Sequence, residues 1–584
     1  MRRLGRFLVW FLALVGLLTL AIVVTSVWAV VAIHKKVEPP LPSQLVMTLD
    51  LDGEFREAPS SDPFARLSGE KSYVMGDVVR AIDRAAGDPR VLGLFATLGH
   101  TKLGMASTQE VRDAVARFRA SGKPAVVFAE TMGEFGGGTV DYYLASAFGQ
   151  VWLQPSGDVG LTGIAAESPF LKGTFDLLGI DTRFSARHEY KGAIEAFTRN
   201  GFSDPARDNV GRLLDSFLAQ AVDGIAAARN QPPEKVRALM GSGPLLASEA
   251  LSAGLVDKLG YREDALAAVR GAGKPKEVDL ADYAEHLPKG HGTRVAVITG
   301  TGAIHRGKSE GPFGSDGFGS DTIAEAFRAA VDDPAVKAIL FRVDSPGGSY
   351  VASDTVWNEV RRARAAGKPV VASMGGVAAS GGYFVSMGAD RVVAQPGTIT
   401  GSIGVFAGKF VLADFWKKIG VSWDEVHRGG DNAHLWSPNR DFTPQAWDRL
   451  NAMLDRIYTD FTAKAAQGRN LPAERMDALA RGRVWSGADA HRQGLVDVLG
   501  GWTVALSEVR GLLKLAPDAE LDLVPFPQEK EPWKLLAKAF SGGSEARTLA
   551  RAVAVLQPLA ARLEALDAAG ADLRMPPLTI EGRP

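Results

Sequence analysis

The residues with the clearest chemical potential are a serine and the glycines that follow it in the second part of the chain. Ser380 lies in the sequence AASGGYF, residues 378–384, directly after an apolar run that predicts a strand. A serine among small residues lets a substrate approach closely, so Ser380 is a candidate nucleophile. The same pattern also occurs in turns whose glycines only permit close backbone packing, and this structural alternative stays open at this stage.

A second glycine-rich turn could stabilise negative charge. Residues 339–349 read ILFRVDSPGGS, an apolar strand that ends in the PGG turn at 346–348. Glycines just past a strand leave backbone N–H groups free to point at an anion, which is what an oxyanion hole requires. Taken together, the two turns favour a nucleophile with an oxyanion site over a packing contact.

Three segments carry a family resemblance: DSPGGS at 344–349, AASGGYF at 378–384 and TGSIGVF at 400–406. In this order and spacing they resemble the signal peptide peptidase A (protease IV) family of membrane-bound serine peptidases, within the ClpP/crotonase superfamily. The resemblance covers roughly residues 46–509 and implies an α/β fold of tandem ClpP/crotonase-like domains. It also implies a homotetramer, no cofactor or metal, and signal peptides and other apolar peptides as substrates.

Two other functions remain open beside the peptidase. SPGG turns also occur in crotonase-type acyl-CoA enzymes, and a degenerate peptidase fold could serve as a non-catalytic membrane scaffold.

The composition of the chain limits the class of protein and the kinds of site it can form. The chain has 584 residues, 46 % hydrophobic and 23 % charged, with a net charge of −1 and no cysteine. These values indicate a globular protein of two or more domains, with nothing that points to nucleic acid and no disulfide or cysteine-ligated metal.

The N-terminus predicts a membrane anchor. Three arginines within residues 1–6 precede an uncharged run at 7–33, which exceeds the roughly 20 apolar residues that span a bilayer. We therefore expect residues 1–36 to form a cytoplasmic stub and one transmembrane helix, with a cleaved signal peptide as the alternative. The catalytic body would then lie on the periplasmic side of a bacterial inner membrane.

The remaining chain contains an internal sequence repeat. Residues 88–107 align without a gap on 333–352, and GLVD at 254–257 aligns on GLVD at 494–497. Self-similarity over a whole domain indicates duplication. We predict a first domain at 45–272, a second at 293–512 and a C-terminal extension at 513–584.

Within each domain, apolar runs alternate with helical patterns, which predicts an α/β fold with largely parallel strands. We expect a strand at 336–343 between helices at 322–331 and 354–366, and a helix that begins after Ser203 and ends near Arg229. We also expect a linker at 274–291, a mobile loop at 311–319, an edge strand at 521–524 and an amphipathic helix at 545–568.

The two halves differ where chemistry would occur. TKL at 101–103 stands opposite the PGG turn, and Thr139 stands opposite Ser380. The second half keeps Ser380, Gly348 and Gly381, so the resemblance implies that the N–H groups of the two glycines form the oxyanion hole.

No histidine–aspartate partner for Ser380 is evident among the nine histidines, although a triad assembled in space stays possible. The family resemblance instead implies a lysine base in a Tyr-Lys segment of the first half, here Lys191, with Ser402 orienting it. A free lysine has a pKa near 10.4, so it must be desolvated to serve as a base at neutral pH. Each half would then supply one member of a Ser-Lys dyad.

Overall fold

The structure, a computed structural model, describes residues 40–59, 72–271, 273–288, 290–309, 317–527, 572–574 and 579–580. The predicted anchor at 7–33 and the predicted helix at 545–568 lie outside these ranges, and so does most of the loop at 311–319. Within the described ranges, no helix combines the length and the apolar character needed to cross a bilayer.

The first half is built on a six-stranded parallel sheet in the order β11-β6-β5-β4-β1-β12. Its strands are β1 (Leu45–Asp50), β4 (Val91–Thr97), β5 (Ala125–Ala129), β6 (Gln150–Leu153), β11 (Lys258–Leu259) and β12 (Lys276–Asp279). Alternating residues of β1 enter different apolar clusters: Leu45 and Met47 face the main core, whereas Val46 faces the cluster of α10 (Arg262–Arg270). Helices therefore cover both faces, as a parallel sheet requires.

The second half repeats this order as β23-β19-β18-β16-β13-β24. Its strands are β13 (Thr293–Thr301), β16 (Ala338–Ser345), β18 (Val370–Ala379), β19 (Arg391–Ala394), β23 (Val498–Leu499) and β24 (Leu521–Phe526). The predicted strand at 336–343 is β16, and the predicted flanking helices are α12 (Ser320–Asp332) and α13 (Tyr350–Ala365). The α/β class and the duplication predicted from sequence are both present in the strand order.

Two short strands extend the halves beyond the predicted boundaries. The predicted linker at 274–291 contains β12 and α11 (Leu280–Glu285), and β12 pairs with β1 at the edge of the first sheet. The predicted edge strand at 521–524 is β24, which pairs with β13 at the matching edge of the second sheet. The repeat therefore continues past residue 513, contrary to expectation. Edge strands need only one neighbour, so KEVD at 276–279 lacks the apolar run that marks a central strand.

Each half also contains a 26-residue helix at the matching position: α7 (Asp204–Arg229) in the first and α16 (Pro444–Arg469) in the second. Ser203 caps α7 by accepting a hydrogen bond from the N–H of Ala206, as its position before an acid and a proline predicts. Asn230 ends α7 in the left-handed conformation, and Asn470 ends α16 in the same way.

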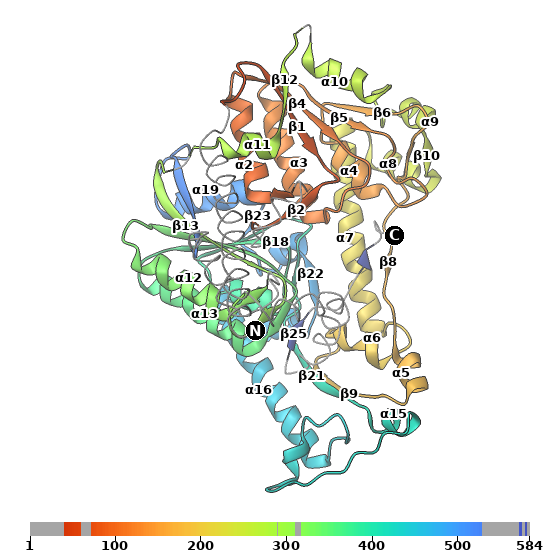
Figure 1. Cartoon of the computed structure of the whole chain (residues 1–584), viewed down its shortest axis with the longest axis vertical. Helices are drawn as coiled ribbons and strands as arrows, with labels where there is room; N and C mark the ends of the chain where they lie inside the picture. Colours follow the sequence, from red (N-terminus) through yellow and green to blue (C-terminus); the bar gives the residue numbers. More distant parts are fainter. Residues whose placement is uncertain are drawn as a thin grey trace, which may run out of the picture.

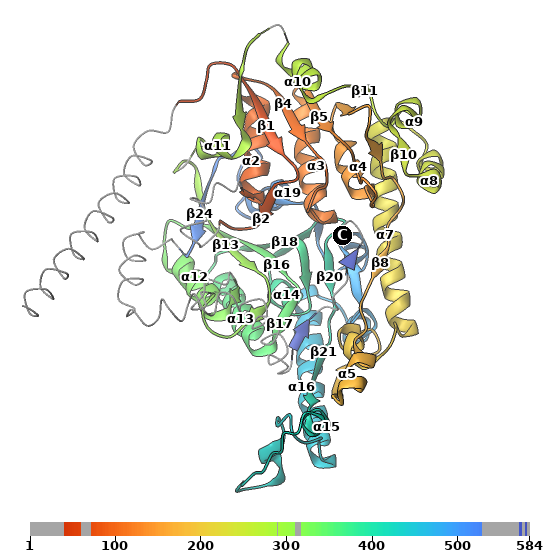
Figure 2. The same ribbon diagram turned by 45° about the vertical axis from the view of Figure 1, so that its right-hand side comes forward.

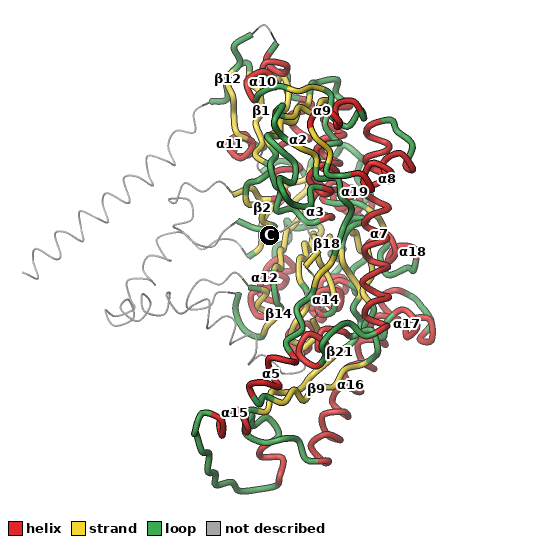
Figure 3. The backbone as a smooth tube through the Cα atoms, turned by 90° about the vertical axis from the view of Figure 1, so that its right-hand side faces the viewer, coloured by secondary structure: helices red, strands yellow, loops and turns green. Residues whose placement is uncertain are grey.

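The halves interlock through two elements of the first that pack on the second. Helix α7 runs down the side of both halves (Figure 1), and buried Asn209 exchanges two hydrogen bonds with the backbone of Val484 in β22 (Val484–Ser486). Strand β9 (Asp181–Arg187) pairs antiparallel along the full length of β21 (Val405–Val411). Figure 3 shows the halves stacked along the long axis, with α15 (Ala413–Lys418) at one end. The first half thereby carries residues just after β9 into the second.

Candidate active site

Ser380 stands at the junction of β18 and α14 (Gly381–Ser386) in an unusual backbone conformation. Its φ and ψ are 57° and −113°, and its side chain is fully buried. The N–H of Ser380 donates to the carbonyl of Gly401 at 2.8 Å, which holds the turn. A non-glycine residue at positive φ costs about 1–3 kcal/mol and persists where surrounding structure enforces it, commonly at functional sites.

The two glycine turns pack directly against each other beside this serine. A Cβ atom on Gly381 would lie 3.1 Å from the N atom of Gly348, and one on Gly348 would lie 2.1 Å from the carbonyl oxygen of Ile304. Only glycine fits such contacts. Gly381 is the first residue of α14, so its N–H has no intrahelical acceptor. The N–H group of Gly381 thus follows Ser380 directly, and the backbone of Gly348 packs against Gly381.

Lys191 brings its amine to Ser380 from the other half of the chain. Its Nζ atom lies 2.8 Å from Ser380 Oγ, 2.9 Å from the carbonyl oxygen of Ser402 and 3.0 Å from Ser402 Oγ. Lys191 is only 2 % exposed, and both serines are fully buried. Three of the predicted site residues therefore form one buried hydrogen-bonded group.

A segment that sequence reasoning did not single out, 481–483, holds the lysine in place. The N–H of Tyr190 donates to the carbonyl of Arg481 at 3.1 Å, and the N–H of Ser402 donates to the carbonyl of Arg483 at 2.7 Å. Gly482 between them has a φ of 84°, and a Cβ there would lie 2.4 Å from the backbone N atom of Lys191. The glycine at 482 therefore lets the backbone of Lys191 come within contact distance.

We call the segment 481–483 the clamp, and two of its side chains also bind the first half. The Arg483 guanidinium stacks 3.8 Å from the centre of the Tyr190 ring. Arg481 forms a two-pronged pair with Glu189, with N–O distances of 2.8 and 2.9 Å, and holds the pKa of that carboxyl below its usual value. The side chains of the two residues before Lys191 are thus fixed to the second half.

Buried charged residues lie next to the glycine turn at 346–348. Asp344 accepts a hydrogen bond from the N–H of Val377 at 2.8 Å, while burial, together with the charge of Glu57, raises the pKa of Asp344 to about 6. The fully buried Arg342 pairs with Glu57 and with Glu110, each at 2.8 Å. Because both glutamates come from the first half, this cluster ties the halves together beneath the site.

In the first half, the position that corresponds to Ser380 holds Thr139. Tyr142 and Tyr383 donate equivalent hydrogen bonds to the carbonyls of Leu255 and Leu495, which places Thr139 opposite Ser380. Thr139 Oγ1 accepts from the N–H of Gly163 at 3.1 Å.

A histidine–aspartate contact in the first half was not evident from sequence. His100 Nδ1 lies 3.0 Å from Asp141 Oδ2, and the N–H of Thr101 donates to the same carboxylate. These contacts fill the place of the PGG turn and involve neither Ser380 nor Lys191. The pair therefore fixes a loop where the second half has its glycine turn.

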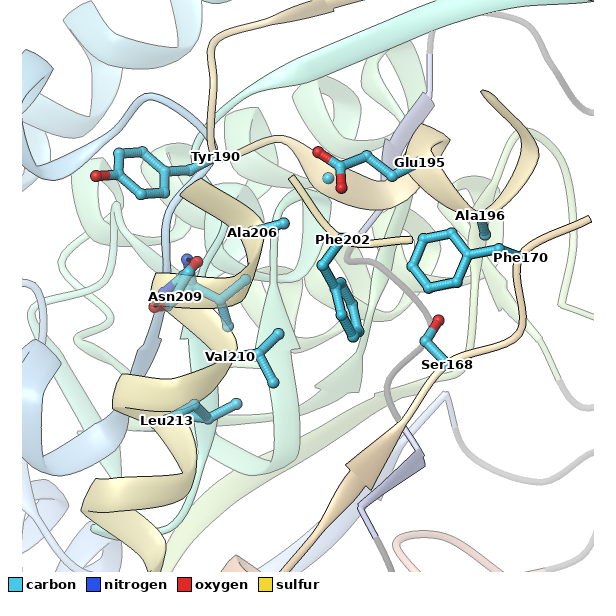
Figure 4. A pocket seen from close by; sticks show the side chains of 12 residues that line it. Ser168, Phe170, Tyr190, Glu195, Ala196, Phe202, Ala206, Asn209, Val210 and Leu213 are labelled. Atoms are coloured by element: carbon cyan, nitrogen blue, oxygen red, sulfur yellow. Dashed lines mark hydrogen bonds between the residues drawn. The ribbon is translucent and has the colours of Figure 1, made fainter. Parts of the chain in front are cut away.

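An apolar pocket is lined mainly by residues of the first half, including Tyr190 (Figure 4). Phe170 and Phe202 meet edge to face with ring centres 5.1 Å apart, and Tyr190 and Gly192 bring the lining up to the lysine. The remaining lining residues are Ser168, Glu195, Ala196, Ala206, Asn209, Val210, Leu213 and Val484. The pocket joins segments from both halves, which is why no local sequence pattern marked it.

One group among the described residues has the spacing of metal ligands: Glu425, His427 and His434. It lies between α15 and α16 and involves none of the predicted site residues. Arg440 already places a guanidinium nitrogen 2.5 Å from Glu425 Oε1. A positive charge in that position opposes cation binding, so the cluster has no evident part in the chemistry of Ser380.

Comparison with known proteins gives the same match in both halves. The peptidase family S49 model matches residues 117–274 and again 362–516. Protease 4 of Salmonella typhi is 33 % identical over 495 residues, covering 80 % of this chain and 78 % of that protein. The chloroplast serine protease SPPA of Arabidopsis thaliana is 30 % identical over 454 residues, covering 76 % of this chain and 66 % of that protein.

Two further similarities are shorter or weaker. A putative signal peptide peptidase SppA of Enterococcus faecium is 28 % identical over 38 % of this chain and 64 % of its own. The solved structure of a ClpP1 mutant from Listeria monocytogenes covers 35 % of this chain and 91 % of its own at 12 % identity, with a TM-score of 0.23. That score carries no argument about the fold, so the ClpP/crotonase likeness stays a prediction.

The family match extends over more than half of the chain and recurs in the half that carries Lys191 and the half that carries Ser380. The chain belongs to peptidase family S49 and is a serine peptidase.

Proposed function

We propose that the chain is a membrane-anchored serine endopeptidase that uses a Ser380–Lys191 dyad to degrade cleaved signal peptides and other apolar peptides. The observation that carries the dyad is the 2.8 Å distance between Lys191 Nζ and Ser380 Oγ inside a buried site. An amine this close to a hydroxyl is within reach of its proton.

The proposed reaction is acyl transfer to serine followed by hydrolysis. Neutral Lys191 takes the proton from Ser380 Oγ as the oxygen attacks the scissile carbonyl, and returns it to the leaving amine. The N–H groups of Gly348 and Gly381 donate to the developing oxyanion, where one such donor contributes about 10²–10³-fold in rate. Water then hydrolyses the acyl-enzyme. Ser402, bonded to Nζ through Oγ and its carbonyl, orients the amine.

Apolar peptides are the proposed substrates because an apolar pocket is lined by the two neighbours of Lys191 in the chain, and because one relative is named for signal peptides. Phe170, Phe202 and Leu213 line it, and the relative from Enterococcus faecium is named for signal peptides. Signal peptides contain an apolar core of about 7–15 residues.

We further propose that residues 7–33 anchor the protein in a bacterial inner membrane with its catalytic body in the periplasm. Removal of residues 1–36 is then expected to yield a soluble protein that still hydrolyses peptides. A truncated protein that folds but is inactive would show that this segment does more than anchor.

A homotetramer is proposed from the family resemblance and from the exposed apolar side chains near α15. These are Leu177, Ile419, Trp423, Val426 and Trp436. Exposed apolar patches commonly mark interfaces. Light scattering of the detergent-solubilised protein is expected to give the molar mass of four chains. The Trp423→Ser Val426→Ser double variant is expected to give a smaller molar mass. A monomeric wild type contradicts this assembly.

A serine-directed fluorophosphonate tests the dyad directly on the full chain. We expect one label per chain, at Ser380 by peptide mass spectrometry, with labelling that becomes faster as pH rises because only a neutral amine accepts the proton. Lys191→Met should label slowly, whereas Thr139→Ala should label like the wild type. Equal rates for Lys191→Met and the wild type would assign the base to another group.

A further inference from the structure

Strand β18 contains a bulge shortly before it reaches Ser380. In its pairing with β16, Met374 faces Val343, but Ala378 already faces Ser345. One residue of β16 therefore stands opposite three residues of β18, where a regular ladder would place one. Bulges bend a strand and are frequent next to active sites, where they redirect a side chain.

Strand β18 changes its neighbour at this bulge. Before the bulge, residues 371–373 pair with β19, and after it, residues 377–379 pair with β20 (Ile399–Gly401). Figure 2 shows β16, β18 and β20 side by side in the second half. The bulge therefore sets how the end of β18 is aligned with β20.

Both aligned strands lead directly to residues of the proposed dyad site. Ser380 follows β18, Ser402 follows β20, and the N–H of Ser380 donates to the carbonyl of Gly401 at 2.8 Å. Lys191 Nζ bonds to the hydroxyl groups of both serines. A shift of β18 relative to β20 would move Ser380 Oγ away from the amine. A displacement of about 1 Å at a reacting group can cost about 10²-fold in rate.

The side chain of Asp344 binds the bulge from β16. Its Oδ1 accepts a hydrogen bond from the N–H of Val377 at 2.8 Å, and its backbone carbonyl accepts one from the N–H of Gly302 at 2.9 Å. From the other side, Thr398 Oγ1 donates to the carbonyl of Gly375 at 2.9 Å. Residues 375–377 are thus bonded both by a residue of β16 and by a residue just before β20.

The first half has a glycine where the second half has Asp344. Gly99 aligns with Asp344 in the repeat and has no side chain that could accept a hydrogen bond. After β5 of the first half, Met132 instead forms a single bridge with Val159. The carboxylate is therefore found in the half that carries the nucleophile.

We propose that Asp344 is a positioning residue for the peptidase reaction: by binding the bulge of β18, it keeps Ser380 Oγ within reach of Lys191. This inference rests on the proposed Ser380–Lys191 dyad. Asp344 acts through the backbone, because its carboxylate bonds to the N–H of Val377, three residues before Ser380. The role requires an oxygen acceptor at this position, which an amide supplies as well as a carboxylate.

Two substitutions of Asp344 separate the acceptor from the shape of the side chain. Asp344→Asn keeps an acceptor oxygen, whereas Asp344→Leu keeps the branched shape and has no acceptor. With a fluorogenic peptide, Asp344→Leu should lower kcat at least about tenfold at an unchanged KM, because only the alignment of the nucleophile is lost. Asp344→Asn should stay within about threefold of the wild type. Equal kcat values for the two variants would overturn the proposal.

A second pair of variants leaves Asp344 itself in place. A Cβ atom on Gly375 would lie 3.0 Å from Asp344 Cβ and 3.1 Å from Oδ1, so in Gly375→Ala the carboxylate must give way. Gly376→Ala is the matched control, because its Cβ would lie in ordinary contact, 3.5 Å from Oδ1. Only Gly375→Ala should lower kcat, by at least about threefold. An unchanged kcat in Gly375→Ala would show that the alignment does not depend on the position of the carboxylate.

Fluorophosphonate labelling of the full chain distinguishes this inference from the dyad. Asp344→Leu should label at Ser380 at least about tenfold more slowly than the wild type, with its urea midpoint as the folding control. A lower midpoint without slower labelling would show that Asp344 only stabilises the fold, which overturns the positioning role and keeps the dyad. A folded wild type that takes no label at Ser380 overturns both.

Discussion

At the scale of single residues, the central feature is an amine and a hydroxyl that meet across 189 positions of sequence. Lys191 and Ser380 each lie in an ordinary-looking segment, and their proposed chemistry depends on what surrounds them. Burial removes water from the pair, and Ser402 supplies two oxygen atoms that hold Nζ in place. Neither residue has this environment within its own half.

The dyad predicts strongly non-additive substitutions. Ser380→Ala and Lys191→Met should each reduce turnover of a fluorogenic peptide by at least about 10³-fold, and the double variant should be no worse, because the two groups act as one unit. Thr139→Ala should stay near wild-type turnover. Circular dichroism controls for folding. Near-normal turnover in Lys191→Met would make the lysine structural and a histidine the better candidate base.

Asp344 predicts a pH-dependent stability. Its pKa is raised from 3.8 to about 6 in the fold, so the folded state binds the proton more tightly than the unfolded state does. This contribution to the free energy of unfolding is fully present below about pH 4 and is lost as pH rises through about 6. By pH 7 the loss amounts to about 3 kcal/mol.

Asp344→Asn does not titrate and can keep the oxygen that accepts the N–H of Val377. Its urea midpoint relative to the wild type should therefore increase between pH 4.5 and 7.5. A difference that is independent of pH would contradict the raised pKa.

At the scale of elements, Lys191 is positioned by strand pairing followed by a clamp. Strand β9 is bound along β21 of the other half, and the chain then passes under residues 481–483. The two glycines of the proposed oxyanion hole, Gly348 and Gly381, are positioned by the ends of β16 and β18, which are neighbouring parallel strands. Carboxyl ends of parallel strands meet at one edge of a sheet, which is where open α/β sheets place their sites.

Gly482→Ala tests the clamp. The added Cβ would lie 2.4 Å from Lys191 N and 2.6 Å from its Cα, so the lysine must move. A displacement of about 1 Å at a catalytic group can cost about 10²-fold, which is the loss expected in kcat. Gly367→Ala is the matched control, because Gly367 has a similar φ of 78° with no atom within 4 Å of the added Cβ. Equal kcat values for the two variants would argue against the clamp.

At the scale of the whole molecule, the two halves of the repeat contribute different residues to the proposed site. The halves keep the same strand order, yet one supplies the lysine and the other the serine and the glycine turn. The site therefore exists only while the halves are docked. Helix α7, strand β9 and the Arg342 cluster maintain this docking.

Arg342→Met should be severe, because it leaves Glu57 and Glu110 of the first half buried without their cation. Removing one partner of a buried ionic group costs about 3–5 kcal/mol. Arg212→Met, at an exposed pair with Asp208, is the control and should leave the urea midpoint close to that of the wild type. Urea unfolding measures both. Equal destabilisation by the two substitutions would show that the cluster does not hold the halves together.

Sequence by itself determined the α/β class, the duplication, and the segments that carry Ser380, Gly348 and Lys191. Strand and helix periodicities are local, and the family motifs are contiguous, so both can be read along the chain. The cap at Ser203 followed for the same reason. Sequence also suggested the split of lysine and serine between halves, through the asymmetry of the repeat.

Only the tertiary structure decided which distant segments touch. Residues far apart in the chain are joined by the contact of Gly482 with Lys191, by the pocket at Phe170 and Phe202, and by the pairing of strand β25 (Asp572–Arg574) with Gly348. The edge strands β12 and β24 also escaped prediction as parts of the repeat, because a two-sided apolar run is absent where only one neighbour exists. Such contacts depend on packing between surfaces that no local pattern encodes, and it is this packing that brings the lysine of one half to the serine of the other.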